Sequence, residues 1–385
     1  MRLAPTDEQQ ALRKEVRDYF AAMMTPEVDA EMARHEMGGP LSRSLQRRMG
    51  ADGWLGIGWP KEYGGQDRSP MEQLIFFDEA ARAGAPVPLL TINTVGPTLM
   101  RFGTDEQKDR FLPGILAGEL QFAIGYTEPA AGTDLASLRT RAVRDGDEYV
   151  INGQKVFTSL ADQSEYVWLA VRTDPEAKKH KGLSIIIVPT SAPGFSVSPI
   201  RVMGEGKTNA TFYEDVRVPV ANLVGPENEG WKLITTQLNH ERVALCNAGT
   251  VYRHLDNVRA WARETGVIDQ EWVQITLARV AARTEFLRLM NWKVAWGLST
   301  GAINPADASV TKVFGTELYC EAYRDLLEVV GQAGYLKRDT PGAVLQGRLE
   351  RAYAGTLILT FGGGTNEIQR DIIAMIGLGM PRAPR

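Results

Sequence analysis

The sequence has 385 residues, 44% of them hydrophobic and 23% charged, and a formal net charge of −4 at pH 7. This length predicts two or three packed units, and the acidic balance excludes the clustered excess of Lys and Arg that nucleic-acid binding requires. No apolar run approaches the roughly 20 residues of a membrane span, and the chain starts without the apolar core of a signal peptide, so we expect a cytoplasmic protein.

The first third of the chain has the pattern of successive helices. Thr6 and Gln9 form a capping-box pair at the start of the first helix, and Leu12 and Val16 begin its apolar stripe. The same periodicity predicts helices over residues 6–24, 41–50, 70–83, 91–101 and 105–117. None of these segments carries a chemical motif of its own, so we interpret them as scaffold and as one wall of a substrate cavity.

The middle third changes to the two-residue period of strands and is rich in β-branched and aromatic residues. Asn152 and Gly153 form a dipeptide that often closes a two-residue hairpin, so we expect a turn there. The predicted strands cover residues 148–154, 166–171, 183–188, 195–199 and 210–213. Together they predict a small β-barrel or sandwich.

The last third returns to helices that are long enough to pack as an antiparallel bundle. They are predicted over residues 228–264, 269–298, 305–330, 341–360 and 366–377. Cys246 and Cys320 lie in this part and fit buried free thiols better than a disulfide framework or a metal site. The expected fold is therefore α+β, with an N-terminal helical domain (1–121), a middle β domain (122–225) and a C-terminal four-helix bundle (226–385).

One charged residue interrupts the apolar stripe of the first helix in this bundle. Trp231, Ile234 and Leu238 recur at helical spacing, and Glu241 holds the next position of the series. Burial would raise the pKa of the Glu241 carboxyl and make it a suitable proton acceptor near neutral pH. The alternative is a buried structural ion pair, although the adjacent Arg242 does not face the same side of a helix.

Four motifs, in their order and separations, carry a resemblance to a known family. They are Tyr-Thr-Glu-Pro-Ala-Ala-Gly-Thr-Asp at 126–134, Asn-Gly-Gln-Lys-Val-Phe-Thr-Ser at 152–159, Asn-His-Glu-Arg at 239–242 and Gly-Gly-Gly-Thr-Asn-Glu-Ile at 362–368. Alone, the first is an ordinary polar turn. Together they make the chain resemble the flavin-dependent acyl-CoA dehydrogenases from Thr6 to Arg382. Within that family it is most similar to the actinobacterial subunits that desaturate CoA thioesters of steroid side chains.

The resemblance implies a reaction and a role for Glu241. Enzymes of this family remove the α-proton of an acyl-CoA with a glutamate while the β-hydride passes to N5 of FAD. Many members carry that glutamate just before a Gly-Thr pair, where this chain has Gly363, and others carry it at the position of Glu241. The second arrangement fits this sequence. The backbone N–H of Gly363 would still donate to the thioester oxygen, and the missing side chain would leave room for a bulky acyl group.

The resemblance also implies which residues contact the cofactor and the substrate. The expected FAD contacts are Tyr126, Thr127, Thr133, Phe157, Ser159, Thr365 and Glu367, and the expected substrate contacts are Arg242 and Thr133. Glu367 stands where the family has glutamine. A carboxylate that can only accept hydrogen bonds is a poor partner for a phosphate.

Two further departures concern contacts that the family makes across a subunit interface. Ala262 and Thr265 occupy the Arg and Phe positions of an Arg-x-x-Phe-Gly motif that reaches the flavin of a neighbouring subunit. Glu328 replaces the glutamine of a Gln-x-x-Gly-Gly-x-Gly motif, and its charge would repel the neighbour's pyrophosphate. The sequence therefore predicts that a related subunit supplies these groups in an α2β2 heterotetramer with half the usual flavin content.

The resemblance implies an electron-transfer flavoprotein as electron acceptor, and it leaves two alternative functions open. One is a homotetrameric branched- or medium-chain acyl-CoA dehydrogenase with the same chemistry. The other is a catalytically silent subunit that only stabilises a paralogue. Glu241 on an apolar stripe argues against the silent subunit, because an unused site has no reason to keep a carboxylate whose burial is costly.

Overall fold

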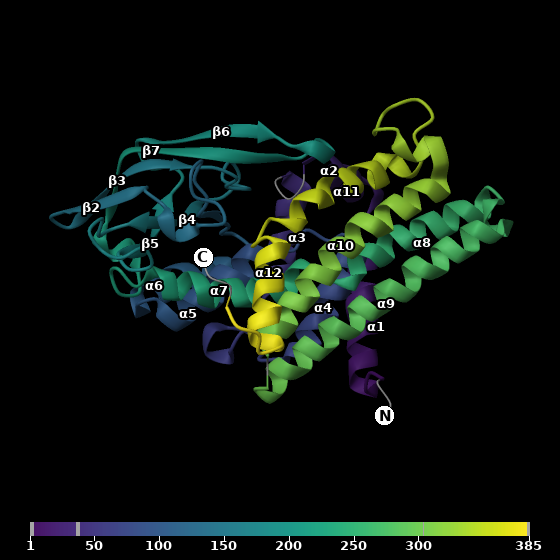
Figure 1. Cartoon of the computed structure of the whole chain (residues 1–385), viewed down its shortest axis with the longest axis horizontal. Helices are drawn as coiled ribbons and strands as arrows, with labels where there is room; N and C mark the ends of the chain where they lie inside the picture. The colour runs from purple at the N-terminus through teal and green to yellow at the C-terminus, as the bar shows by residue number, and fades with distance from the viewer. Residues whose placement is uncertain (1–3, 36–38, 303, 383–385) are drawn as a thin grey trace.

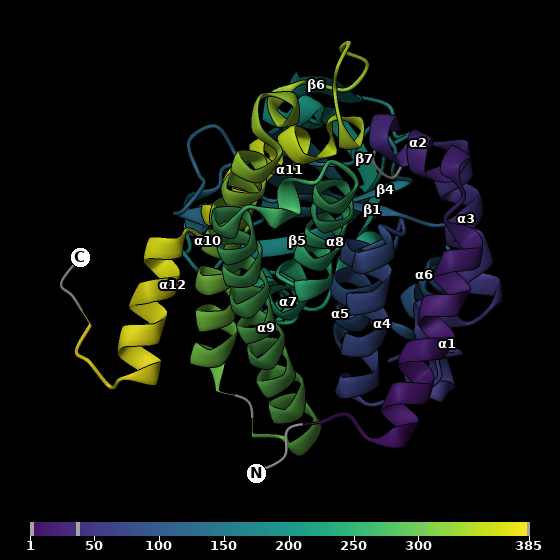
Figure 2. The ribbon, with the colours of Figure 1, turned by 90° about the vertical axis from the view of Figure 1, so that its right-hand side faces the viewer.

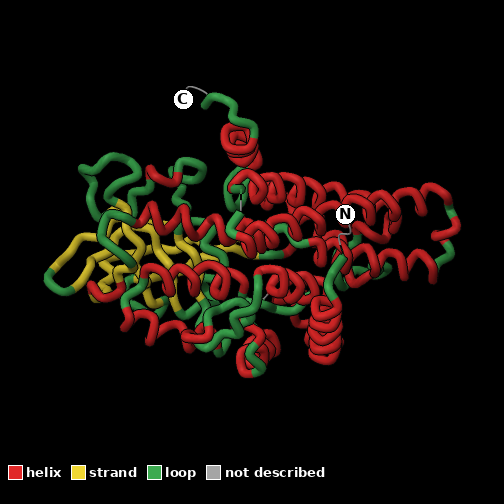
Figure 3. The backbone as a smooth tube through the Cα atoms, turned by 90° about the horizontal axis from the view of Figure 1, so that it is seen from below, coloured by secondary structure: helices red, strands yellow, loops and turns green. Residues whose placement is uncertain are grey.

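The computed structural model describes residues 4–35, 39–302 and 304–382; the side chains of residues 33–35, 205, 238–245 and 305 lie outside this description. The molecule is elongated, with its strands gathered at one end and its longest helices at the other (Figure 1, Figure 3). Helix α7 (Gly230–Leu245) contacts strand β5 (Leu183–Pro189) and helix α10 (Pro305–Val330), so it lies between the sheet and the bundle.

The N-terminal third folds as its capping signals indicate. The Thr6 hydroxyl accepts from Gln9 N and the Gln9 side chain accepts from Thr6 N, which makes a complete capping box. Val16 and Phe20 are fully buried on the inner face of this first helix. The helices are α1 (Asp7–Met23), α2 (Pro26–His35), α3 (Pro40–Ala51), α4 (Pro70–Ala83), α5 (Gly96–Phe102) and α6 (Asp105–Leu116).

Two features of this third differ from the prediction. Helix α2 falls in a stretch for which the periodicity predicts no helix. The helix expected over 91–101 begins as a π-helical turn, Thr91–Val95, before α5 continues it. Pro97 has no N–H to donate, so regular α-helical bonding cannot run through this point. Such turns are frequent at functional sites, and this one contacts α7.

The middle third forms one mixed sheet, which confirms the predicted strand-rich domain. Its order is β6–β7–β3–β2–β4–β5–β8, with β1 paired to β4 in parallel and β4 to β5 in antiparallel orientation. No residue of β4 or β5 is exposed, so these central strands are buried on both faces. The strands are β1 (Phe122–Gly125), β2 (Arg141–Asp145), β3 (Glu148–Lys155), β4 (Tyr166–Arg172), β5, β6 (Phe195–Arg201), β7 (Lys207–Pro219) and β8 (Leu223–Val224).

The predicted hairpin at Asn152 and Gly153 is wrong. Both residues lie inside β3, where the pairing with β7 shifts its register, and the Asn152 side chain exchanges hydrogen bonds with Asp215 of β7. A Cβ at position 153 would lie 2.6 Å from Thr140 Oγ1. The glycine therefore serves a bulge with a close approach rather than a chain reversal.

The C-terminal third is helical, but its first predicted helix is in fact two. Helix α7 ends at Leu245, and the Asn247 side chain begins α8 by accepting from Thr250 N. Asparagine favours such a capping position over a helix interior, so the single helix expected over 228–264 breaks here. The helix expected over 341–360 is shorter than predicted. The helices are α7, α8 (Ala248–Glu264), α9 (Glu271–Thr300), α10, α11 (Arg348–Thr356) and α12 (Asn366–Ile372).

Helices α8, α9 and α10 are the long rods of the bundle and pack side by side (Figure 1). Their common core contains Val258, Val280 and Leu326. Helix α12 lies on the outer side of α10, and the chain end beyond it extends away from the body (Figure 2). Both thiols are free, but only Cys246 is fully buried, whereas Cys320 is partly exposed. Among the described helices, none combines the length and apolar character that a bilayer crossing demands.

Candidate active site

The 126–134 stretch follows β1, and its first side chain is fixed inside the protein. Tyr126 is 8% exposed. Its hydroxyl accepts from Trp168 Nε1 of β4 over 3.2 Å and donates to Gln237 Oε1 of α7. This chain of hydrogen bonds ties the sheet, the start of the stretch and α7 together.

A buried ion pair holds the backbone of the same stretch. Lys155 Nζ at the end of β3 donates to Tyr126 O over 3.1 Å and to Glu128 Oε1 over 2.8 Å. The Glu128 carboxylate also accepts from the backbone N–H groups of Arg139 and Thr140. Burial lowers the pKa of Lys155 to about 8, while Lys155 and these backbone donors hold the pKa of Glu128 below its usual range. These hydrogen bonds fix the beginning of the stretch and tie it to the backbone at residues 139 and 140.

The rest of the stretch presents open backbone and exposed hydroxyls. Thr127 O accepts from Val156 N over 2.8 Å, so the stretch runs beside the end of β3. Thr133 is exposed, and a Cβ at Gly132 would meet no atom within 4 Å. A flat polar ligand could therefore approach this backbone closely.

The neighbouring turn holds an aromatic side chain outward in a strained conformation. Phe157 has a φ of 59° and is 57% exposed, a combination that an aromatic residue adopts only when its surroundings impose it. The next residue anchors it, because Thr158 N donates to Asn209 O over 2.9 Å. The exposed Ser159 hydroxyl lies 3.0 Å from Thr208 Oγ1. The outward ring of Phe157 offers a stacking surface to a flat partner.

The glycine-rich C-terminal loop is pinned by a second buried lysine. Gly363 and Gly364 have φ values of 66° and 95°, which favour glycine. Lys312 Nζ of α10 donates to Gly364 O and to Asn366 Oδ1, both over 2.7 Å. The lysine is fully buried, whereas Gly363 is exposed, so the loop is anchored on one side and open on the other.

The two predicted contacts beyond this loop belong to the start of α12. Thr365 caps the helix, its hydroxyl accepting from Ile368 N over 3.3 Å. Glu367 is exposed in the first turn, where the backbone N–H groups lower the pKa of its carboxyl. Glu367 is therefore an anion at neutral pH, and the FAD contact expected of it remains a prediction.

Helix α7 carries Glu241, but the side chains of Glu241 and Arg242 lie outside the described part of the chain. The backbone there is helical. Leu233, Ile234 and Gln237 are fully buried on this helix, and position 241 continues their stripe at a spacing of seven from 234 and four from 237. The backbone thus places residue 241 on the inner face of α7.

The end of α7 and the glycine-rich loop meet the same segment of α10. The Cys246 thiol at the end of α7 contacts Lys312 O at 4.0 Å, and Lys312 Nζ holds the carbonyl of Gly364. Lys312 thus contacts both the end of the helix that carries Glu241 and the loop that carries Gly363.

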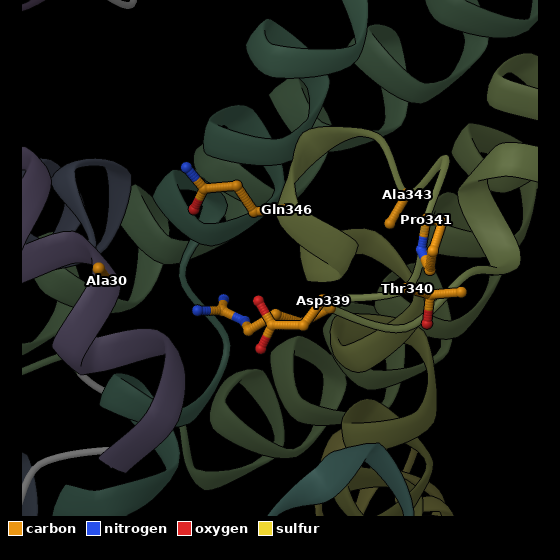
Figure 4. A pocket seen from close by; sticks show the side chains of 7 residues that line it. Ala30, Asp339, Thr340, Pro341, Ala343 and Gln346 are labelled. Atoms are coloured by element: carbon orange, nitrogen blue, oxygen red, sulfur yellow. The ribbon is translucent and has the colours of Figure 1, made fainter.

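Two surface hollows lie outside this constellation or at its margin. The first, of about 390 Å³, is formed by Ala30 of α2 and the loop 338–346 and includes none of the predicted site residues (Figure 4). The second, of about 410 Å³, adjoins the 126–134 stretch and is lined by Arg139, Arg141, Arg172 and Lys179. Lys179 pairs with Asp134, and the other three cations make the hollow a favourable place for anionic groups.

Four buried residues that hold the site together were missed by the sequence analysis: Lys155, Trp168, Gln237 and Lys312. Lys155 falls on the inward alternation of β3 with Tyr149 and Ile151, which is a detectable signal for a buried charge. Gln237 likewise sits three residues after Ile234 on the buried stripe. The sequence gives no comparable sign for Trp168 and Lys312, because their partners are distant in the chain.

This combination of a helical domain, a mixed sheet and a helical bundle around one buried helix defines a flavoprotein oxidoreductase of the acyl-CoA-oxidising class. Three family descriptions match in chain order: the acyl-CoA dehydrogenase N-terminal domain over residues 6–119, the middle domain over 123–216 and the C-terminal domain over 228–378. The chain belongs to the acyl-CoA dehydrogenase family, whose members depend on FAD.

Individual relatives are similar over the full length. Acyl-CoA dehydrogenase FadE26 of Mycobacterium tuberculosis is 59% identical, with 100% of both chains covered. Among solved structures, the Tcur3481-Tcur3483 steroid ACAD matches with a TM-score of 0.93 and 53% identity, and the ChsE4-ChsE5 complex from Mycobacterium tuberculosis with 0.92 and 59%; both cover 100% of each chain.

The described residues fit FAD on one side. The outward Phe157, the open Gly132 and the exposed Thr133 leave a surface on which a flat ring can lie. At the two positions that the resemblance assigns to a neighbouring subunit's FAD, Ala262 is buried in α8 and Glu328 is an exposed carboxylate on α10, so neither offers a cation or an amide donor.

Proposed function

We propose that this chain is the catalytic subunit of an acyl-CoA dehydrogenase that introduces a trans double bond between the α- and β-carbons of a bulky acyl-CoA, with Glu241 as the base. The observation that carries the proposal is the position of residue 241 on the buried stripe of α7, combined with a glycine at 363. A carboxylate in that environment is poorly solvated and accepts a proton readily near neutral pH.

The residues divide the reaction between two elements. Glu241 accepts the proton from the α-carbon, and the N–H of Gly363 donates to the thioester oxygen on which negative charge develops. FAD, when bound, supplies the acceptor for the β-hydride. Arg242 and Thr133 are the proposed substrate contacts. The anchoring of the loop by Lys312 supports this role for Gly363, because an N–H held in place needs no reorganisation during the reaction.

The proposed substrate is a CoA thioester of a steroid side chain. The absence of a side chain at Gly363 supports a wide acyl cavity. The cationic hollow of Arg139, Arg141, Arg172 and Lys179 supports a substrate with phosphate groups. The similarity to a steroid ACAD supports the steroid class.

We also propose an α2β2 assembly with a related subunit that completes the FAD site, and an electron-transfer flavoprotein as electron acceptor. Ala262 and Glu328 support the need for a second subunit, since neither provides a cation or an amide for a pyrophosphate. Large apolar side chains exposed along α9 and at the end of the chain support an interface there. They are Trp272, Ile275, Phe286, Trp296, Ile376, Leu378 and Met380.

The test is Glu241→Gln in the complex co-expressed with its partner subunit. We expect turnover of a steroid side-chain CoA thioester to fall by about 10²–10⁴-fold, since proton transfer by a positioned base contributes about that much. Glu229→Gln is the matched control, because Glu229 is exposed at the start of the same helix. Unchanged turnover in Glu241→Gln, with normal flavin content, would favour a silent subunit instead.

A further inference from the structure

Gln237 is a fully buried side chain with one of its two polar ends unused. It is 0% exposed on α7. Its Oε1 accepts from the Tyr126 hydroxyl, but its Nε2 has no hydrogen-bond partner within the described part of the chain. Buried side-chain amides nearly always satisfy both ends. What distinguishes this unused donor from other unpaired amide ends is its place on α7, the helix that carries Glu241.

The neighbouring hydrogen bonds fix which way the amide points. The Trp168 indole N–H can only donate, so the Tyr126 oxygen accepts from it over 3.2 Å and keeps its own proton for Gln237. That proton needs an acceptor, which is the amide oxygen. The amide nitrogen of Gln237 is thereby directed away from Tyr126.

Residue 241 is the carboxylate position within one helical turn of Gln237. Residues four apart on an α-helix lie on the same face, one turn from each other. Gln237 and Glu241 have this spacing within α7, and 237 belongs to the buried stripe that 241 continues. A glutamine amide is long enough to reach a carboxylate one turn further on.

We propose that Gln237 is a positioning residue whose Nε2 donates a hydrogen bond to the Glu241 carboxylate and holds it ready for proton abstraction. Tyr126 and Trp168 in turn fix Gln237, so a relay of three side chains connects the sheet to the base. The inference rests on the proposed role of Glu241. A donor bound to a carboxylate favours its ionised form, and it therefore keeps the base active at lower pH.

The other charged groups around α7 are mostly paired or exposed. The π-helical turn and β5 carry no titratable side chain. Helix α5 brings Arg101 at an exposed position. On α9, Arg288 pairs with Glu285, and Lys293 pairs with Asp307 over 2.8 Å. Because they are exposed or paired, we expect these groups to have little effect on the pKa of Glu241.

Helix α10 brings the one buried cation among the described charges that face α7, Lys312. The titratable groups of α10 near this contact are Lys312, Glu317 and Tyr319, with Cys246 at the end of α7; α7 itself also carries Lys232, which is exposed, and His240 and Arg242, whose side chains lie outside the described part of the chain. Glu317 pairs with Arg370 over 2.6 Å. Lys312 and Gln237 are thus the two buried groups that can favour an ionised Glu241, one by charge and one by a hydrogen bond.

The experiment is the pH dependence of kcat in the co-expressed complex for Gln237→Met and Gln237→Glu. Both changes remove the donor. Gln237→Glu keeps an acceptor for Tyr126 and so preserves that contact, but it adds a like charge one turn from Glu241. We expect the acidic limb of the profile to move to higher pH by about one unit in Gln237→Met, and further in Gln237→Glu, because losing the donor raises the pKa of the base.

Gln121→Met is the matched control. Gln121 is buried, its Nε2 donates to Gln46, and its Oε1 has no partner within the described residues, but it lies before β1. The acidic limb of the kcat–pH profile of Gln121→Met should stay at the wild-type pH. A second readout that needs no turnover is the pH dependence of binding of a non-reacting acyl-CoA analogue, followed by flavin absorbance, which should shift in parallel.

An acidic limb that stays at the wild-type pH in both Gln237 variants would overturn the inference, as would a uniform loss of activity at every pH. Failure of the proposed function is a separate result. If Glu241→Gln remains active, the base assignment falls; if Glu241→Gln is inactive and the Gln237 profiles are unshifted, only the positioning role falls.

Discussion

At the scale of single residues, two buried lysines hold the loops of the candidate site. Lys155 donates to the carbonyl of Tyr126, and Lys312 donates to the carbonyl of Gly364. Removing a lysine from water is costly unless its donors are satisfied, so each is retained for the loop geometry it fixes. The candidate site residues could be predicted from four motifs, but these lysines could not be assigned to their loops without the fold.

Lys155→Met should destabilise the protein by about 3–5 kcal/mol, because it leaves the Glu128 carboxylate buried without its cation. The measurement is urea-induced unfolding of the complex at fixed protein concentration. Lys207→Met is the control: Lys207 forms a more exposed pair with Asp162 over 2.5 Å, and such pairs contribute about 1 kcal/mol or less. Equal losses in the two variants would mean that Lys155 is not a clamp.

Gly363→Glu should narrow the range of acyl groups. The new side chain enters the proposed acyl cavity, and position 363 has a φ of 66° that disfavours any side chain. We expect at least a tenfold lower kcat/KM for bulky thioesters than for short ones, relative to the wild type, in a chain-length screen. Gly266→Ala carries a similar backbone cost at a φ of 75° in open space. It should leave kcat/KM unchanged for bulky and for short thioesters. Unaltered turnover of bulky thioesters would contradict a cavity at Gly363.

At the scale of elements, the sequence predicted most helices because their caps are local. The capping boxes of Thr6 and Thr104 lie where α1 and α6 begin. The errors arose where a local signal had two meanings. Asn152 and Gly153 have the composition of a hairpin turn, but pairing with β7 and the approach of Thr140 make them a bulge. Such long-range contacts are invisible to periodicity.

The break between α7 and α8 depends on a capping side chain at the start of α8. Asn247 is the N-cap of α8, and its side chain accepts from Thr250 N over 3.0 Å. Asn247→Ala should lower the free energy of unfolding by about 1 kcal/mol, whereas Asn247→Ser retains a capping oxygen and should lose less. Urea unfolding measures both. Equal losses in the two variants would mean that the cap does not hold this junction.

At the scale of the whole molecule, the chain has features of one part of a larger assembly. Helix α9 exposes Phe286 and Trp296, and α12 with the chain end stands on the outer side of α10 (Figure 2). Large aromatic side chains are enriched at protein interfaces, so these two positions on α9 are candidates for a contact surface. The sequence indicated a partner through Ala262 and Glu328, but it could not locate the surface, because exposure depends on the packed bundle.

Trp296→Glu should weaken assembly with the partner subunit by more than about tenfold, since large aromatic side chains contribute heavily at interfaces. Size-exclusion chromatography at decreasing protein concentration measures this, and circular dichroism verifies that the helices remain. Arg279→Glu, at an exposed and already charged position of the same helix, is the control and should assemble normally. An intact complex with Trp296→Glu at all concentrations would place the interface elsewhere.

In the proposed reaction, the carboxylate of Glu241 meets the α-carbon of a thioester between α7 and the glycine-rich loop. An experimental structure of the co-expressed complex with FAD and a non-reacting acyl-CoA analogue tests it most directly. We expect a Glu241 oxygen about 3–3.5 Å from that α-carbon, as reaction requires, with the N–H of Gly363 directed at the thioester oxygen. A Glu241 side chain that points into solvent, or another carboxylate at that carbon, would contradict it.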